Sequence, residues 1–570
     1  MFRFIRLILF TSLLLTGFTA KAQKGNYFIH NYLPSQYQAA DQNRCILQDM
    51  YGRVFVANND GFLVNNGAEW DKYGLPFLCL SLGKDENEQI FIAGDGDFGK
   101  IIQNSNGAFK FESLKKLLKD SLKNLGRFWS IITLKGHVYF CSNQIILDYD
   151  YKTIKSILPG EEGFHTFFEV EDKFILREKG VGLKILSAGN EFTLLKGGEV
   201  FADNSNPVRA IIKGENCHYI VTPLSLYRFN FNKVLPELSG IEKINSPINT
   251  WLNEKTVYCA EKIGNAFFAF GSVNGGLLIT DENFHPINQI NTGNTLQDDG
   301  VNYIYNDNQG HIWLALAKGI SLIEFNSPIT RFTKSEGVIG TVESCAIFNG
   351  TAFLATDKGL LQYNPGTLRF ETTIIKEAAW CLKSFDNVLL AGTNYGLYKY
   401  NANNGFELIY ETPSALHSIL YNPVNQLIYL GTETGFAKGI LEQNKFTPVK
   451  EYFDLEIDIR TMSCASDGVF FGTTTSGIYF EKKNQDSLII LNEKNGLPNL
   501  NENYLFNYNN EMLIATDNGI YKISDYEKLS VTLDSRFNLI NNKYIVARAF
   551  NDNKNGVWLT TKLKKDPKAI

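Results

Sequence analysis

The strongest constraint on the fold is a short phrase that recurs along almost the whole chain. Residues 306–325 read NDNQGHIWLALAKGISLIEF, and the chain reads NDNKNGVWLTT from residue 551. A polar turn, an apolar run that ends in small residues, a glycine and a second apolar run are typical of a β-hairpin. Because the pattern returns about every 35 to 50 residues, we expect a repeat protein built from β units.

Thirteen copies of this unit can be recognised. Strong copies contain VFVANNDGFL, VYFCSNQII, WLALAKGI, AFLATDKGL, LLAGTNYGL, IYLGTETGF, VFFGTTTSGI and MLIATDNGI; weaker copies contain IFIAGDGDFGKI, FILREKGVGL, CHYIVTPLSL, AFFAFGSVNGG and VWLTT. Short strands joined by glycine turns predict four-stranded antiparallel blades, packed radially as in a β-propeller. Helical repeats would need 3.6-residue apolar spacing, and a solenoid would need a shorter and stricter period.

The number of units predicts an all-β protein made of two consecutive β-propellers. One ring holds about four to eight blades, so thirteen units need two rings of about seven blades each, the second of them incomplete. The expected boundaries are residues 23–328 for the first propeller and 329–570 for the second. Residues 24–40 can add an N-terminal strand that closes one ring, because an open ring leaves an unpaired sheet edge.

Two features of the unit predict how blades fit together. Small residues end the second strand where neighbouring sheets converge; examples are Ala315, Ala355, Ala391, Gly392, Gly431 and Gly472. Glycines in the next turn stand where the backbone is expected to need φ > 0; they are Gly319, Gly359, Gly396, Gly435, Gly477 and Gly519.

Composition narrows the class of partner. Aromatic residues make up 13% of the chain, which suits strands, and the net charge is −5. Lysines gather only in the last residues, so we expect no nucleic acid to be bound. The eight cysteines are scattered through apolar strand runs without metal-ligand spacing, which favours buried free thiols over disulfides or a metal site.

The N-terminus indicates export. Arg3 and Arg6 precede an apolar run, residues 7–18, and Ala20-Lys21-Ala22 follows before Gln23. This order is typical of a cleaved signal peptide, here residues 1–22, and predicts a periplasmic protein; a membrane anchor is the alternative, although the apolar run is short for a span.

Motifs for enzymes, phosphates and metals are missing from the sequence. It contains no G-x-S-x-G elbow, phosphate-binding loop, H-E-x-x-H or dinucleotide fingerprint. Asp95 and Asp97 in GDGDFG resemble part of a cation loop, but their place in the repeat favours a blade turn. We therefore expect no catalytic residues, no metal and no cofactor.

Aligning the units points to a binding site in the channel of a propeller. The residue just before each inner strand is expected to face the channel mouth. In the first ring these residues are Arg44, Leu80, Trp129, His165, Arg209, Tyr258 and Asn302; in the second they are Glu343, Trp380, His417, Arg460, Asn503 and Ala547. Planar rings beside forked donors suit sugars, and the alternative is that these side chains fill the channel or cap strands. The predicted ligand-binding residues are Arg44, Trp129, His165, Arg209, Tyr258, Asn302, Trp380 and Arg460.

The phrases DNQGHIWLALAKGI, SPITRF and GTVESCAIFNGTAFLATDKGL resemble the two-component-regulator propeller repeats of Bacteroidota sensor proteins, over residues 40–562. The resemblance implies an extracytoplasmic double propeller. Fuller members of that family continue into a tyrosine-rich β-sandwich, a membrane helix and a histidine kinase or helix-turn-helix output domain. The hybrid two-component branch binds oligosaccharides.

The resemblance implies a ligand-sensing region that passes its signal to a separate or missing output module, with an oligosaccharide or another small envelope molecule as ligand and a homodimer as a further expectation. A scaffold for protein partners and a polysaccharide-active enzyme are the alternatives. The chain departs from the family pattern by breaking into KLKKDPKAI after NGVWLTT. We therefore expect a truncated or separated piece of a longer sensor, with a second ring less stable than the first.

Overall fold

The computed structural model describes residues 25–564 except 106, 119–124, 188–190, 232–237, 368, 484, 486, 510 and 552–555. The predicted signal peptide, residues 1–22, lies outside the described residues. The chain divides into two compact units, 25–331 and 332–570. The described part contains only two α-helices, α2 (Pro34–Tyr37) and α3 (Asn249–Glu254), and otherwise consists of strands, turns and short 3₁₀ segments.

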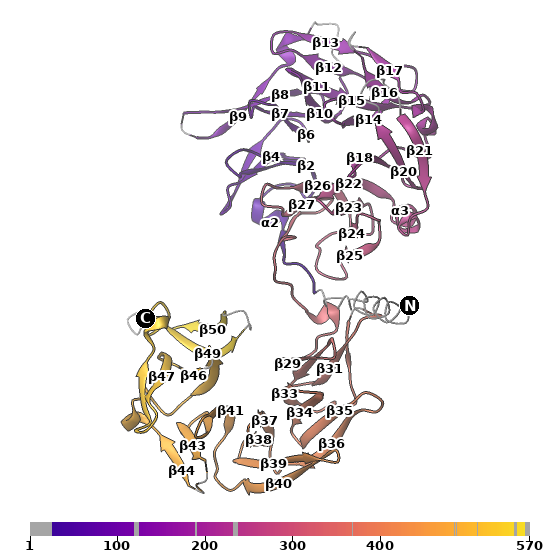
Figure 1. The fold of residues 1–570 in the computed structure, drawn as a ribbon. Coiled ribbons are helices and arrows are strands. Elements are labelled where there is room, and N and C mark those ends of the chain that lie inside the picture. Colours follow the sequence, from indigo (N-terminus) through magenta and orange to yellow (C-terminus); the bar gives the residue numbers. More distant parts are fainter. Residues whose placement is uncertain are drawn as a thin grey trace, which may run out of the picture. The chain divides into compact units, whose positions relative to one another are not determined.

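The first unit is a seven-bladed propeller of four-stranded antiparallel sheets, drawn from indigo to pink (Figure 1). Its blades are blade 1, β2 (Asn43–Gln48), β3 (Val54–Asn58), β4 (Gly61–Asn65) and β5 (Trp70–Gly74); blade 2, β6 (Cys79–Lys84), β7 (Ile90–Gly94), β8 (Phe98–Gln103) and β9 (Phe109–Ser113); blade 3, β10 (Phe128–Leu134), β11 (His137–Ser142), β12 (Ile146–Tyr149) and β13 (Ile154–Ile157); blade 4, β14 (Phe164–Glu169), β15 (Phe174–Glu178), β16 (Gly182–Leu186) and β17 (Phe192–Leu194); blade 5, β18 (Ala210–Lys213), β19 (His218–Val221), β20 (Leu226–Phe231) and β21 (Leu238–Ile244); blade 6, β22 (Val257–Ile263), β23 (Phe267–Ser272), β24 (Leu277–Asp281) and β25 (Pro286–Ile290); and blade 7, β26 (Val301–Asn306), β27 (Ile312–Leu316), β28 (Ile320–Ile323) and β1 (Ile29–Tyr32).

The second unit places five four-stranded sheets and one two-stranded sheet along an arc (Figure 1). Its blades are blade 8, β29 (Val342–Phe348), β30 (Thr351–Thr356), β31 (Gly359–Asn364) and β32 (Arg369–Thr372); blade 9, β33 (Ala379–Phe385), β34 (Val388–Thr393), β35 (Gly396–Asn401) and β36 (Gly405–Glu411); blade 10, β37 (Leu416–Asn422), β38 (Leu427–Thr432), β39 (Phe436–Glu442) and β40 (Lys445–Tyr452); blade 11, β41 (Ile459–Ala465), β42 (Gly468–Thr473), β43 (Ile478–Lys482) and β44 (Leu488–Leu491); blade 12, β45 (Tyr504–Tyr508), β46 (Glu511–Thr516), β47 (Gly519–Asp525) and β48 (Ser530–Leu533); and the two-stranded sheet, β49 (Tyr544–Asn551) and β50 (Val557–Leu563). The prediction of an all-β double propeller is confirmed.

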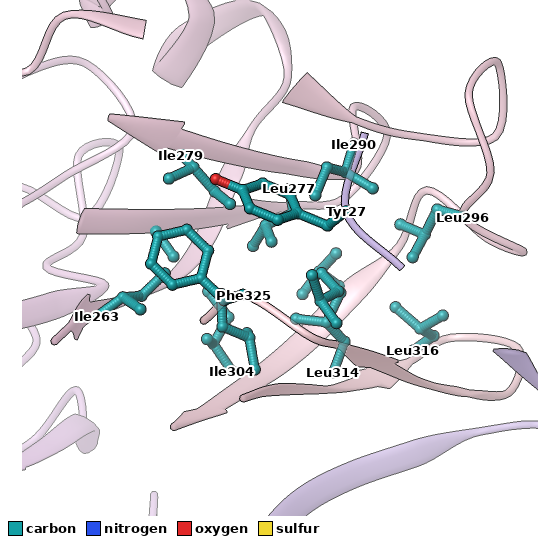
Figure 2. Packing of buried hydrophobic residues seen from close by; sticks show 14 residues of the cluster. Tyr27, Ile263, Leu277, Ile279, Ile290, Leu296, Ile304, Leu314, Leu316 and Phe325 are labelled. Atoms are coloured by element: carbon teal, nitrogen blue, oxygen red, sulfur yellow. The ribbon is translucent and has the colours of Figure 1, made fainter. Parts of the chain in front are cut away.

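An N-terminal strand closes the first ring, as predicted from residues 24–40. β1 pairs antiparallel with β28 and completes blade 7. Just before it, Tyr27 is 1% exposed and its ring centroid lies 5.1 Å from that of Phe325. Figure 2 shows Tyr27 inside the hydrophobic cluster that joins blades 6 and 7. The N-terminal segment therefore holds the last blade to the ring by both backbone pairing and apolar burial.

The repeated phrase has a direct structural cause in blade 7. One carboxylate oxygen of Asp307 accepts hydrogen bonds from the backbone N–H groups of Gln309 and His311, and the other accepts one from Trp313 Nε1 at 3.0 Å. Asp49 and Asp85 cap the equivalent turns of blades 1 and 2 in the same way. An aspartate at this position stabilises the turn between the first two strands of a blade by accepting its backbone N–H groups.

The small residues act as predicted. A Cβ added to Gly431 would lie 2.4 Å from Ser418 Oγ and 2.6 Å from Ile459 Cγ2, and Ile459 belongs to the next blade. The six turn glycines predicted to need φ > 0 have φ between 73° and 149°. The small residues at the strand ends therefore permit close packing of neighbouring blades, and the turn glycines permit the left-handed backbone of the turn.

The cysteines are free thiols, and four of them are buried. Three take part in contacts between blades: Cys45, Cys259 and Cys381 each direct Sγ to a backbone oxygen of the following blade, at 3.6–3.7 Å. Cys345 is exposed, so the prediction of burial is wrong there, because its side chain lies at an uncovered position of β29. None of the described helices has the length and apolar character of a membrane span.

Candidate functional site

A β-bulge sets the direction of the candidate side chains in the first propeller. In blade 1, Asn43 pairs with Asn58 and Cys45 with Ala57, so Arg44 has no partner across the strand. The same irregularity occurs in the inner strands of blades 2, 3, 4, 6 and 7, and it leaves out Leu80, Trp129, His165, Tyr258 and Asn302. A bulged residue is released from the regular ladder, and its side chain can be aimed out of the sheet.

Blade 5 reaches the same arrangement one residue before its inner strand. The backbone N–H of Arg209 donates to the carbonyl oxygen of Val221 at 2.8 Å, and the next residue, Ala210, pairs with that same Val221. Arg209 and Ala210 therefore both face Val221, so two residues oppose one, as at the bulges of the other blades.

All seven residues line one cavity of about 750 Å³ in the first propeller. They are Arg44, Leu80, Trp129, His165, Arg209, Tyr258 and Asn302. Trp129 and Tyr258 keep 39% and 36% of their surface exposed, so two aromatic faces are open to the cavity. A cavity of this volume is within the range of ligand sites for small molecules.

Three polar side-chain atoms of this cavity have no hydrogen-bond partner. Arg44 Nε, His165 Nδ1 and Arg209 Nε are buried, and none has a hydrogen-bond partner. The amide of Asn302 differs, because its Nδ2 donates to the backbone oxygen of Asn43 at 2.8 Å and so joins blade 7 to blade 1. Buried donors without acceptors are costly in a folded protein, and a bound molecule can satisfy them.

Burial and nearby positive charges lower the pKa values of the basic side chains in the cavity. The guanidinium carbon of Arg209 lies 5.5 Å from the centre of the Tyr258 ring. Burial lowers the pKa of both Arg44 and Arg209. Burial, assisted by Arg177, Arg209 and Lys179, lowers the pKa of His165 to about 4. His165 is therefore neutral at pH 7 and offers one donor and one acceptor nitrogen.

The cavity also contains residues that the sequence reasoning missed. Glu169 and Glu261 line it and are exposed to the channel, where partial desolvation by the surrounding walls raises the pKa of both carboxyls, that of Glu261 to about 7. Tyr303 lines it as well and is 36% exposed. Counting onward from each bulge along the inner strand could have found them, because His165 and Glu169 share β14 and Tyr258 and Glu261 share β22.

The candidates in the second propeller are arranged differently. Trp380 Nε1 donates to Asn394 Oδ1 at 2.7 Å. Asp458 accepts from Arg460 at 2.8 Å and lies 3.2 Å from His417 Nδ1; burial opposes its ionisation, but these two partners hold its pKa below the ordinary value. Trp380, His417 and Arg460 thus each have a polar partner in the protein, although His417 Nε2 is buried without a hydrogen bond. Neither Trp380 nor Arg460 lines the cavity of about 350 Å³ found in this unit.

The other aligned positions of the second propeller also lie at irregular points of the inner strands. Glu343, Trp380, His417, Arg460 and Ala547 are bulged, and Asn503 directly precedes β45. The two aspartates of GDGDFG form turn contacts. Asp97 accepts from the N–H of Phe98 and from Ser113 Oγ, and Asp95 lies 3.3 Å from Arg127 Nε.

Comparison with known proteins places the fold. No family model and no curated protein matches the chain. Among solved structures, the extracellular domain of a hybrid two component system from B. thetaiotaomicron is similar over 94% of this chain and 76% of its own length, with 17% identity and a TM-score of 0.67. The extracellular domain of a one component system from the same organism is similar over 94% of this chain and 82% of its own length, with 14% identity and a TM-score of 0.40. A streptogramin B lyase is similar over 53% of this chain and 98% of its own length, with 12% identity and a TM-score of 0.41.

Proposed function

We propose that the chain is the extracytoplasmic ligand-sensing region of a signal-transduction regulator, and that the channel of its first propeller binds an oligosaccharide. The signal would pass to a separate histidine kinase or DNA-binding output module. The observation that carries this proposal is one cavity that combines open aromatic faces with buried donors lacking acceptors.

The side chains suit a saccharide. Trp129 and Tyr258 can stack on the apolar faces of pyranose rings. Arg44, His165 and Arg209 can bond hydroxyl oxygens, since their free donors point to no protein acceptor. A ligand that contacts both groups would gain stacking and would satisfy donors that are otherwise unpaired.

The sensor role rests on the fold and on one neighbour. The solved structure that matches with a TM-score of 0.67 is described as the extracellular domain of a two component system. That description supports a sensing role for a chain of the same architecture. It agrees with the predicted signal peptide and the expected periplasmic location, which N-terminal sequencing of the exported protein would test at Gln23.

Binding measurements on two variants test the ligand site. A glycan array selects a ligand, and titration calorimetry then compares Trp129→Ala and Arg209→Ala with the wild type. Each variant is expected to weaken binding by roughly 1–3 kcal/mol, the scale for the loss of an aromatic contact or of a charged hydrogen bond.

Two substitutions serve as matched controls. Trp558 is 57% exposed in β50, and Arg228 forms an exposed pair with Glu242 on the outer part of blade 5. Trp558→Ala and Arg228→Ala should leave the affinity unchanged. Full affinity in both channel variants would place the ligand elsewhere and reject the proposed site.

A further inference from the structure

The proposed function leaves the charge of the ligand open, and the arginines of the channel bear on it. Five other arginines pair with a carboxylate; they are Arg53 with Asp49, Arg127 with Asp95, Arg228 with Glu242, Arg460 with Asp458 and Arg536 with Asp534. In the part of the chain that the structure describes, neither Arg44 nor Arg209 forms such a pair, although both are partly buried. Two guanidinium groups therefore face the cavity without a counter-charge.

The carboxyls of the channel do not supply that counter-charge. Glu169 and Glu261 line the same cavity, but in the described residues neither forms an ion pair with Arg44 or Arg209. Glu261 stands three residues beyond the bulged Tyr258, which at the rise of a strand is about 10 Å further along the channel. The unpaired guanidinium groups and the acidic side chains of the cavity therefore stand at different levels of the inner strands.

One of the two arginines lies beside an aromatic ring of the cavity. Arg209 from blade 5 lies with its guanidinium carbon 5.5 Å from the centre of the Tyr258 ring. Arg44 comes from blade 1 and lines the same cavity. Each of the two guanidinium groups can therefore meet a ligand that enters the channel.

A buried guanidinium without a carboxylate is unfavourable, and a bound anion relieves the cost through charge-assisted hydrogen bonds. We propose that the ligand carries anionic groups, carboxylates or sulfates, which bind the unpaired guanidinium groups of Arg44 and Arg209 in the channel. The ligand class is then an acidic oligosaccharide, with uronic acid or sulfated residues. This inference rests on the proposed function, because it assumes that the channel binds a saccharide.

Paired probes test the inference. An oligogalacturonide is compared with its carboxyl-reduced form, and a heparin-derived oligosaccharide with its desulfated, carboxyl-reduced form. The wild type should bind at least one acidic probe about tenfold or more tightly than its neutral counterpart, and added salt should reduce the difference. The probe that shows the larger preference identifies carboxylate or sulfate as the recognised group.

Variants then assign the preference to the two arginines. Arg44→Gln and Arg209→Gln should each reduce the ratio of acidic to neutral affinity, Arg209→Lys should retain most of it, and Arg228→Gln should retain all of it. The ratio is measured within one protein, so a variant that unfolds loses both probes and is not mistaken for a loss of charge recognition. Inorganic sulfate should compete with the acidic probe in the wild type.

The outcomes separate this inference from the proposed function. Equal affinity for acidic and neutral probes, or a preference that survives both glutamine variants, overturns the anionic ligand and leaves saccharide binding in place. Absence of binding by any glycan overturns the proposed function, and the inference with it.

Discussion

Single residues decide what the first channel can recognise. Each bulge in an inner strand takes one side chain out of the ladder and turns it to the cavity, and these side chains carry the open rings and the unpaired donors. The same position in the second propeller holds His417 and Arg460, but both contact Asp458. Equivalent backbone positions therefore carry unpaired arginines in one propeller and an arginine paired with Asp458 in the other.

The neutral state of His165 predicts a dependence of stability on pH. Its folded-state pKa of about 4 lies below the ordinary value of about 6.5. Below pH 6.5 the unfolded chain binds a proton that the folded chain does not, so this group lowers stability as the pH falls from about 6.5 to 4. His165→Gln should remove the part of the acid-induced loss of stability that comes from this group.

Pulse proteolysis in urea, which follows each propeller by its own fragments, measures the effect at pH 7, 6 and 5. The difference between His165→Gln and the wild type should grow in favour of the variant as the pH falls. A constant difference between His165→Gln and the wild type would contradict the assignment.

At the scale of elements, closure distinguishes the two rings. β1 adds a fourth strand to blade 7, and Tyr27 packs into the cluster between blades 6 and 7 (Figure 2). The sheet formed by β49 and β50 has two strands in the described residues, and Trp558 and Leu563 are 57% and 58% exposed. The first ring is therefore sealed by a segment distant in sequence, while the last sheet of the second unit keeps apolar surface in water.

Removal of the Tyr27 side chain should open the first ring. Tyr27→Ala deletes an aromatic group that is 1% exposed, and such deletions cost about 3–5 kcal/mol. Tyr51 is 74% exposed, so Tyr51→Ala should change the stability by less than about 0.5 kcal/mol. The urea midpoint of the first propeller measures both, and equal midpoints for the two variants would show that the N-terminal segment does not hold the ring.

Most of the element pattern could be predicted from the sequence, because strand alternation and glycine turns are local. The four-stranded blades, the positive φ of Gly319 and its equivalents, and the residues at the bulges follow from aligning the repeats. The pairing of side chains could not be predicted in this way. Asp458 meets His417 from a different blade, and Glu261 faces the cavity only because the bulge fixes the register of β22.

At the scale of the whole molecule, the two units are expected to respond differently to stress. The first has seven four-stranded sheets and a paired N-terminal strand, and the second has five four-stranded sheets followed by a two-stranded one. Each blade is stabilised mainly by its neighbours, as in other repeat architectures, so an exposed end lowers the stability of the blades next to it.

Limited proteolysis tests this difference. Cleavage should begin beyond about residue 331, where the second unit starts, and a fragment close to residues 25–331 should persist. Mass spectrometry of the fragments over time identifies the sites. Equal survival of both units, or early cleavage within blades 1 to 7, would contradict the expected order.

The bulges have a consequence for how such a protein can diversify. A residue outside the ladder contributes little to strand pairing, and its side chain faces a cavity instead of a packed core. Exchanging Trp129, His165 or Arg209 alters the chemistry of the channel and leaves the frame of the blade as it is. One scaffold can thus acquire new ligand preferences by a few point changes, each nearly neutral for folding, and seven such positions surround a single cavity.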